Sequence, residues 1–179
     1  MTRKKILLFI TLFVVLGTLS YLSYSVIVKA KEKKLTANRL QIIPEFQFED
    51  LKSSTFTNAS LQENKAAIFV YFNTQCDYCQ HEAQSISERL DELTNVQFIF
   101  VSTEDIETIK QFSENHNLNH QPNITFVHDN TDIFSTKFGA TAMPYLLIYD
   151  KDQQLIKKHK GQLNANGILK ALIPAKAGI

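Results

Sequence analysis

The sequence predicts an α/β fold: one domain with a central sheet, joined to an N-terminal helix that spans a membrane. Three observations predict it. A long uncharged apolar segment lies near the N-terminus, an apolar strand pattern runs directly into a helical pattern near the middle of the chain, and further strands and helices alternate after it. Such alternation favours parallel strands with right-handed connections. We expect a mixed sheet of about five strands with helices on both faces.

Length and composition allow one such domain. The chain has 179 residues, which is room for a domain of ordinary size and an appendage. Its hydrophobic content of 44%, with 13 Phe, is ample for a packed core. The net charge is only +1, whereas a nucleic-acid-binding domain normally has a marked basic excess. We therefore expect no nucleic acid among its partners.

The apolar segment near the N-terminus covers residues 6–28 and consists mostly of Leu, Ile, Val and Phe. At about 1.5 Å per residue, a helix of this length crosses a hydrocarbon core of about 30 Å. The segment is also too long for the core of a typical signal peptide. We predict an uncleaved transmembrane anchor at 6–28, preceded by a short cytoplasmic tail at 1–5.

The charges around the anchor do not fix its orientation. Basic residues lie at 3–5 before it and again within 29–34 after it, so the positive-inside rule does not favour export of the C-terminal part. The charged, helix-compatible stretch 29–42 is typical of a solvated stalk. The rest of the chain is expected to form a domain at 43–174 and a C-terminal tail at 175–179.

The domain begins with the pattern of a hairpin. Residues 45–49 alternate between charged or polar and Phe, which is typical of a strand with one buried face. Residues 55–57 can supply a short partner strand. We expect this N-terminal pair to extend the edge of the sheet.

The middle of the chain contains the strand on which the domain is centred. Residues 66–72 form a continuous apolar run rich in β-branched and aromatic side chains, which predicts a strand buried on both faces. Ala83, Ile86 and Leu90 then recur at helical spacing. Cys76 and Cys79, the two cysteines of the chain, lie at the junction.

The remaining elements follow in order. A helix is expected to start at Ser102 or Thr103, ahead of the acidic Glu104 and Asp105, and to end near residue 117. The other predictions are a strand at 96–101, a strand at 124–127, a short helix at 131–138, an antiparallel hairpin of 145–149 with 154–159, and a final helix at 166–173.

The two cysteines point to dithiol chemistry. Thiols three residues apart in the first turn of a helix can face each other, and the unpaired N–H groups there favour a thiolate on the first. Zinc would need two further ligands. The only pair at useful spacing is His116 and His120, far along the chain and without a second C-x-x-C. We expect no bound metal.

These motifs together resemble the thioredoxin superfamily. The resemblance rests on the strand, C-x-x-C and helix, and on residues 141–145, Thr-Ala-Met-Pro-Tyr, which lead into an apolar strand. Glu82, three residues after the second cysteine, and the anchor make the chain similar to the membrane-tethered thiol-disulfide oxidoreductases of the TlpA/ResA type. The resemblance covers roughly residues 43–173 and implies a thioredoxin-like fold.

The resemblance also implies roles for individual residues. Cys76 would attack the partner disulfide and Cys79 would resolve the mixed disulfide, so the redox-active Cys76–Cys79 disulfide would be the only redox group, without another cofactor. Glu82 would sit near the dithiol and transfer protons; the alternative is an exposed helix acid.

A second set of residues would bind the substrate. Pro144 would follow a cis peptide bond, the alternative being a trans proline that starts a strand. The backbone of Met143 would then pair with an incoming extended peptide. Gln75 stands where the family usually has a Trp before the first cysteine, so it too is expected to contact the substrate.

The leading functional hypothesis is a membrane-anchored enzyme that reduces disulfides of exported proteins. Asp77 beside Cys76 disfavours a second negative charge, which favours a reducing disposition; the alternative is a first-turn acid that only stabilises the helix. By analogy with the family, the partners would be protein thiols and disulfides, including apocytochromes c, and an upstream electron donor in the membrane. The protein would cross the cytoplasmic (inner) membrane once, with its catalytic domain on the extracytoplasmic (periplasmic) side, where disulfides form.

Two other functions remain open from the sequence. A thiol peroxidase would have Thr and Pro where this chain has Asn73 and Phe69. A copper(I)-binding chaperone would use both thiols, with Met143 or His81 as a further ligand.

Overall fold

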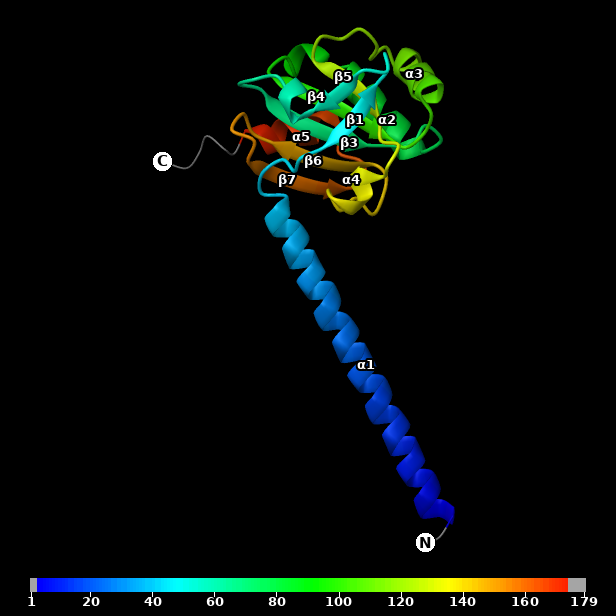
Figure 1. Ribbon diagram of the computed structural model, residues 1–179. Helices are drawn as coiled ribbons and strands as arrows, with labels where there is room; N and C mark the ends of the chain where they lie inside the picture. The colour runs from blue at the N-terminus through cyan, green and yellow to red at the C-terminus, as the bar shows by residue number, and fades with distance from the viewer. Residues whose placement is uncertain (1–2, 174–179) are drawn as a thin grey trace. The chain divides into compact units, whose positions relative to one another are not determined.

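The computed structural model describes residues 3–173, which divide into a long helix and a compact domain. Helix α1 (Arg3–Arg39) is continuous over 37 residues (Figure 1). Within it, Leu12–Arg39 contains a stretch of mean hydropathy 1.6, and in the described part of the chain this is the one helix long and apolar enough to cross a membrane. Residues 1–2 of the expected cytoplasmic tail and the expected tail at 175–179 lie outside the described residues.

The compact domain contains one seven-stranded sheet in the order β2-β1-β5-β4-β3-β6-β7. This is more than the predicted count of about five, because the N-terminal hairpin pairs with β5 and so belongs to the same sheet. The strands are β1 (Gln47–Asp50), β2 (Thr55–Thr57), β3 (Ala66–Tyr71), β4 (Val96–Ser102), β5 (Ile124–His128), β6 (Tyr145–Tyr149) and β7 (Leu155–Lys160).

The sheet is mixed, as expected. Strands β3, β4 and β5 run parallel, with Ile68 opposite Phe98 and Phe100 opposite Phe126. Strand β6 is antiparallel to β3 and to β7, and β1 is antiparallel to β5. Because β3 is paired on both sides and covered on both faces, five of its six residues are buried. The apolar run that predicted this strand is therefore confirmed as the centre of the sheet.

Helices cover both faces of the sheet (Figure 1). On one face the buried side chains of three helices share a core with Ile68, Val70 and Phe72. On the other face Phe69 and Tyr71 pack against a short helix and the chain that leads into β1. The three helices are α2 (Asp77–Ser87), α3 (Ile106–Asn115) and α5 (Ala165–Leu172); the short helix is α4 (Ile133–Thr136). Two 3₁₀ turns, Asn58–Ser60 and Leu90–Glu92, complete the elements.

The compact domain begins at Arg39. Leu40 is fully buried in it, and the side chain of Arg39 donates to the carbonyl oxygens of Thr136 and Lys137 at 3.4 Å. The backbone N–H of Leu155 donates to the carbonyl of Gln41 at 2.9 Å. The last residues of the stretch expected to form the stalk are thus part of the domain.

Helix α3 starts later than predicted. Ser102 remains in β4, and Asp105 is the N-cap, with its carboxylate accepting from the N–H of Thr108 at 2.9 Å. The start at Ser102 or Thr103 was wrong because the carboxylate of Glu104 accepts hydrogen bonds from Thr74 and does not belong to the first turn of the helix.

Candidate active site

The two cysteines lie where β3 leads into α2. Cys76 is the N-cap of α2, and its sulfur accepts a hydrogen bond from the backbone N–H of Cys79 at 3.3 Å. The unpaired N–H groups of a helix N-terminus stabilise negative charge. Cys76 is half-buried, whereas Cys79 is only 2% exposed. An incoming disulfide can therefore reach the first sulfur but not the second.

The segment before β6 lies against the same sulfur. The thiol of Cys76 donates to the carbonyl oxygen of Met143 at 3.8 Å, across 67 positions of sequence. The Met143–Pro144 peptide bond is cis. The carbonyl of Pro144 accepts from the N–H of Gly161 at 2.9 Å, which ties this loop to the end of β7. The fold thus brings together Cys76, Met143 and Pro144, as the sequence predicted that it would.

Burial sets the protonation of the second cysteine. Desolvation by its apolar surroundings raises the pKa of the Cys79 thiol, and a hydrogen bond with Cys76 raises it further. Cys79 is therefore a neutral thiol at neutral pH. It must lose its proton before it can attack a sulfur, since the thiolate is the nucleophile.

Glu82 is fully buried one turn after Cys79. Residues three apart share a helix face. Burial raises the pKa of Glu82 from its ordinary 4.5 to about 8, although a hydrogen bond from the N–H of Leu163 to Oε2, 3.4 Å long, opposes the rise. The other oxygen, Oε1, has no hydrogen-bond partner among the described residues. The alternative interpretation of Glu82 as an exposed acid is wrong.

Gln75 and the residues between the cysteines face solvent. Gln75, Asp77 and Tyr78 are all exposed, and Tyr78 keeps 65% of its accessible surface. The backbone N–H of Gln75 donates to the side-chain oxygen of Asn73 at 2.9 Å, which shapes the loop. The side chain of Gln75 makes no hydrogen bond within the described chain. It is free to contact a bound molecule.

Glu104 holds the loop that precedes Cys76, a role that the sequence did not predict. Its carboxylate accepts from the backbone N–H and from the hydroxyl of Thr74, both at 2.8 Å, and from the hydroxyl of Ser102 at 3.2 Å. The carbonyl of Thr74 accepts from the side chain of Gln80 at 2.9 Å. Three hydrogen-bonding groups of Thr74, its N–H, hydroxyl and carbonyl, are therefore held in place two residues before Cys76. The only signal in the sequence was an acid at the end of a buried strand, which we assigned to a helix start.

The described residues contain no group of three or more His, Cys, Asp or Glu side chains that could hold a metal ion. The ring of His116, one of the two histidines weighed as zinc ligands, contacts the carbonyl of Phe112 at 2.9 Å through Nδ1. His81 is exposed on α2.

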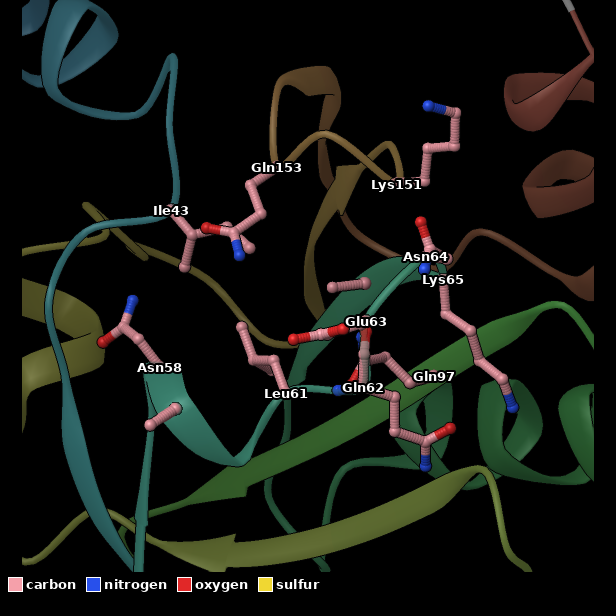
Figure 2. A pocket seen from close by; sticks show the side chains of 12 residues that line it. Ile43, Asn58, Leu61, Gln62, Glu63, Asn64, Lys65, Gln97, Lys151 and Gln153 are labelled. Atoms are coloured by element: carbon pink, nitrogen blue, oxygen red, sulfur yellow. The ribbon is translucent and has the colours of Figure 1, made fainter.

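Figure 2 shows a pocket of about 360 Å³. Its lining includes Ala67, near the start of β3, whereas the dithiol follows the end of that strand. The lining also includes Gln97, near the start of β4. The buried amide of Gln97 accepts from the N–H of Gln62 at 2.8 Å and donates to the carbonyl of Gln62 at 2.9 Å. The polar groups of this pocket thus hold the loop before β3, away from the cysteines.

Comparisons with known proteins agree with the fold. The sequence profile of the AhpC/TSA family matches residues 40–159. No curated protein matches the chain in sequence.

Several solved structures are similar to the domain. A secreted Mycobacterium tuberculosis disulfide oxidoreductase homologous to E. coli DsbE is 22% identical, with a TM-score of 0.60 over 75% of this chain and 96% of that one. A putative thioredoxin from Neisseria meningitidis is 21% identical, with a TM-score of 0.61 over 75% and 92%. StoA from Bacillus subtilis is 12% identical, with a TM-score of 0.57 over 73% and 98%. At these identities the likeness establishes the shared thioredoxin-like fold.

The clamp on Thr74 predicts the effect of Glu104→Gln. The amide nitrogen of Gln cannot accept a hydrogen bond, so at least one of the three donors loses its partner. We expect the free energy of unfolding to fall by about 1–3 kcal/mol and amide hydrogen exchange at Thr74, Gln75 and Cys76 to accelerate. Unchanged exchange at these three residues would contradict the clamp, and exchange in β5 is the internal control.

The raised pKa of Glu82 predicts a specific pH dependence of stability. Because the pKa is about 8 in the folded state and ordinarily 4.5, the folded protein keeps a proton that the unfolded chain releases. This contribution is fully present below pH 4.5 and is lost as the pH rises to about 8; its size is on the order of a few kcal/mol.

Denaturant titrations of the reduced protein across this range test the prediction. Glu82→Gln should remove the decline between pH 4.5 and 8, because the neutral amide does not titrate. Glu88→Gln, at the exposed C-cap of the same helix, should leave the decline in place. Parallel curves for the wild type and Glu82→Gln would show that Glu82 does not titrate in this window.

Proposed function

Since the chain belongs to the AhpC/TSA family, we propose that it is a membrane-tethered thiol-disulfide oxidoreductase that reduces disulfides of exported proteins through Cys76 and Cys79. The observation that carries the proposal is the arrangement of the dithiol. A half-exposed sulfur caps a helix N-terminus, and a buried thiol follows one turn later. A main-chain carbonyl of the loop around Pro144 faces the first sulfur. Nucleophile, resolving thiol and a backbone to pair with a substrate are thus combined at one place.

The reaction runs in two exchanges. The Cys76 thiolate attacks one sulfur of a client disulfide, the client S–S bond breaks, and the released client thiolate takes a proton. Cys79 then attacks the Cys76 sulfur of the mixed disulfide as a thiolate, which releases the second client thiol and forms the Cys76–Cys79 disulfide. Two electrons pass from the protein to the client. An external dithiol donor must reduce the protein again before the next cycle.

Glu82 accepts the proton of Cys79 in this proposal. Both groups are buried and lie three residues apart on one face of α2. A carboxylate with a pKa of about 8 is a much better proton acceptor than an ordinary one, because it holds the proton at neutral pH. Only its ionised form can accept, so the resolving step should speed up as the pH approaches 8.

Met143, Pro144 and Gln75 bind the client. The carbonyl of Met143 lies 3.8 Å from the reacting sulfur and can accept from a backbone N–H of an extended peptide after the thiol proton has left. Gln75 adds an exposed amide directly before Cys76. Contacts of this kind recognise a main chain rather than a particular side chain, which suits varied clients.

The membrane assignment rests on α1. We place the protein in the cytoplasmic (inner) membrane as a single-pass protein, with its domain on the extracytoplasmic (periplasmic) side. The support is the apolar stretch in Leu12–Arg39 and the use of a tethered dithiol where disulfides form. Apocytochromes c are candidate clients there, and a membrane protein with its own dithiol is the candidate electron donor.

Two observations argue against the other functions. Asn73, which stands where a thiol peroxidase would have Thr, uses its side-chain oxygen to hold the N–H of Gln75. For a copper(I) chaperone, the atom of Met143 that faces the Cys76 sulfur is the carbonyl oxygen, a hard ligand, and His81 lies exposed on α2.

Turnover of the full chain in detergent micelles tests the proposal. With dithiothreitol as the electron donor, the wild type should accelerate the reduction of insulin disulfides, and Cys76→Ser should abolish the acceleration. In a single turnover of the pre-reduced protein without dithiothreitol, Cys79→Ser should instead accumulate a mixed disulfide with insulin, because no second thiol is present to resolve it. The proposal fails if insulin is not reduced while hydrogen peroxide is consumed, or if one equivalent of copper(I) is bound without any turnover.

A further inference from the structure

A groove of about 400 Å³ lies between the loop that precedes Cys76, the first turns of α2, and helix α3. It begins at Thr74 and Gln75, the two residues that precede the nucleophile. We call it the amide groove. It is lined by Thr74, Gln75, Gln80, Thr108, Gln111, Phe112, Asn115 and His116.

The lining of the amide groove has an unusual composition. Asp, Glu, Lys and Arg make up 21% of the chain but are absent from this lining, and six of its eight residues carry a neutral amide or hydroxyl. The side-chain amides of Gln75, Gln111 and Asn115 make no hydrogen bond within the described part of the chain. The buried ring of Phe112 lies against the ring of His116, with centroids 4.3 Å apart and the planes tilted by 33°. The groove therefore offers free amide donors and acceptors.

The position of the groove relative to the dithiol follows from the sheet order. Strand β3, which leads to Cys76, lies between β6 and β4. Met143 comes from the loop before β6, whereas α3 follows β4. The Met143 loop and the amide groove thus flank Cys76 from opposite sides. A polypeptide joined to Cys76 through its own cysteine has the Met143 loop on one side and the groove on the other.

We propose that the amide groove binds the client polypeptide next to the client's reacting cysteine. One flank of that cysteine pairs with Met143, and the other flank lies in the groove. The groove selects extended segments of uncharged polar residues. Amide side chains can donate to backbone carbonyls and accept from backbone N–H groups. A charged client side chain would lose hydration there, and no Asp, Glu, Lys or Arg belongs to the lining to pair with it. The proposal rests on the proposed function and deepens it by naming the substrate class as neutral, unfolded segments around a cysteine.

The test compares two disulfide substrates of the full-length protein in detergent micelles. One is a peptide disulfide whose cysteine is flanked on both sides by Gly, Ser and Asn; the other is hydroxyethyl disulfide, which cannot reach the groove. The double variant Gln111→Ala, Asn115→Ala should lower kcat/KM for the peptide by about tenfold, mainly through KM, and should leave the rate with hydroxyethyl disulfide unchanged. The control variant Gln84→Ala changes an exposed position of α2 outside the groove. Its kcat/KM should equal that of the wild type with both disulfide substrates.

A second variant checks the charge argument. Gln111→Glu should lower kcat/KM for a peptide with Asp in its flanks and raise kcat/KM for one with Lys, each relative to the neutral peptide. If the double variant has the same kcat/KM for the neutral peptide as the wild type, the groove proposal is overturned. If the wild type reduces neither disulfide, the proposed function itself has failed, so the two failures are distinguishable.

Discussion

The site depends on one constraint, the position of Cys76 as the N-cap of α2. Strand β3 is buried on both faces and paired on both sides, so its end is fixed within the sheet. The loop that follows is held by Glu104 through Thr74, and α2 is packed through Cys79, Ala83 and Ile86. The backbone of Cys76 is thus held from the strand side and from the helix side. In this position its sulfur contacts the N–H of Cys79 and the carbonyl of Met143.

The first turns of α2 are partly exposed and partly buried in the apolar core, and this difference in burial separates Cys76 from Cys79 and Glu82. Cys76 lies at the boundary, where a disulfide can approach, while Cys79 and Glu82 lie inside, where desolvation raises the pKa of each. Two buried acids next to each other cannot both be ionised at low cost. In the proposed second step, Cys79 can therefore give up its proton only to an ionised Glu82.

Local patterns in the sequence predicted the central strand, the dithiol at its end and the hairpin at the edge of the sheet, because each is encoded within a few consecutive residues. The buried position of Glu82 next to Cys79 could be expected only from a family resemblance, since nothing local distinguishes a buried helix glutamate from an exposed one. Glu104 and the amide groove could not be predicted at all. They arise where the end of β4 and the face of α3 meet a loop some 30 positions earlier in the sequence, and such contacts leave no periodic signal.

The most direct measurement of the central claim is a redox titration of the Cys76–Cys79 pair in the full-length protein, with free thiols counted by mass spectrometry across a dithiothreitol or glutathione series. The account predicts one two-electron transition between dithiol and disulfide, with a reduction potential near that of thioredoxin, about −270 mV. A potential near about −120 mV would contradict the reducing direction. If no Cys76–Cys79 disulfide formed at any potential, the dithiol mechanism itself would be contradicted.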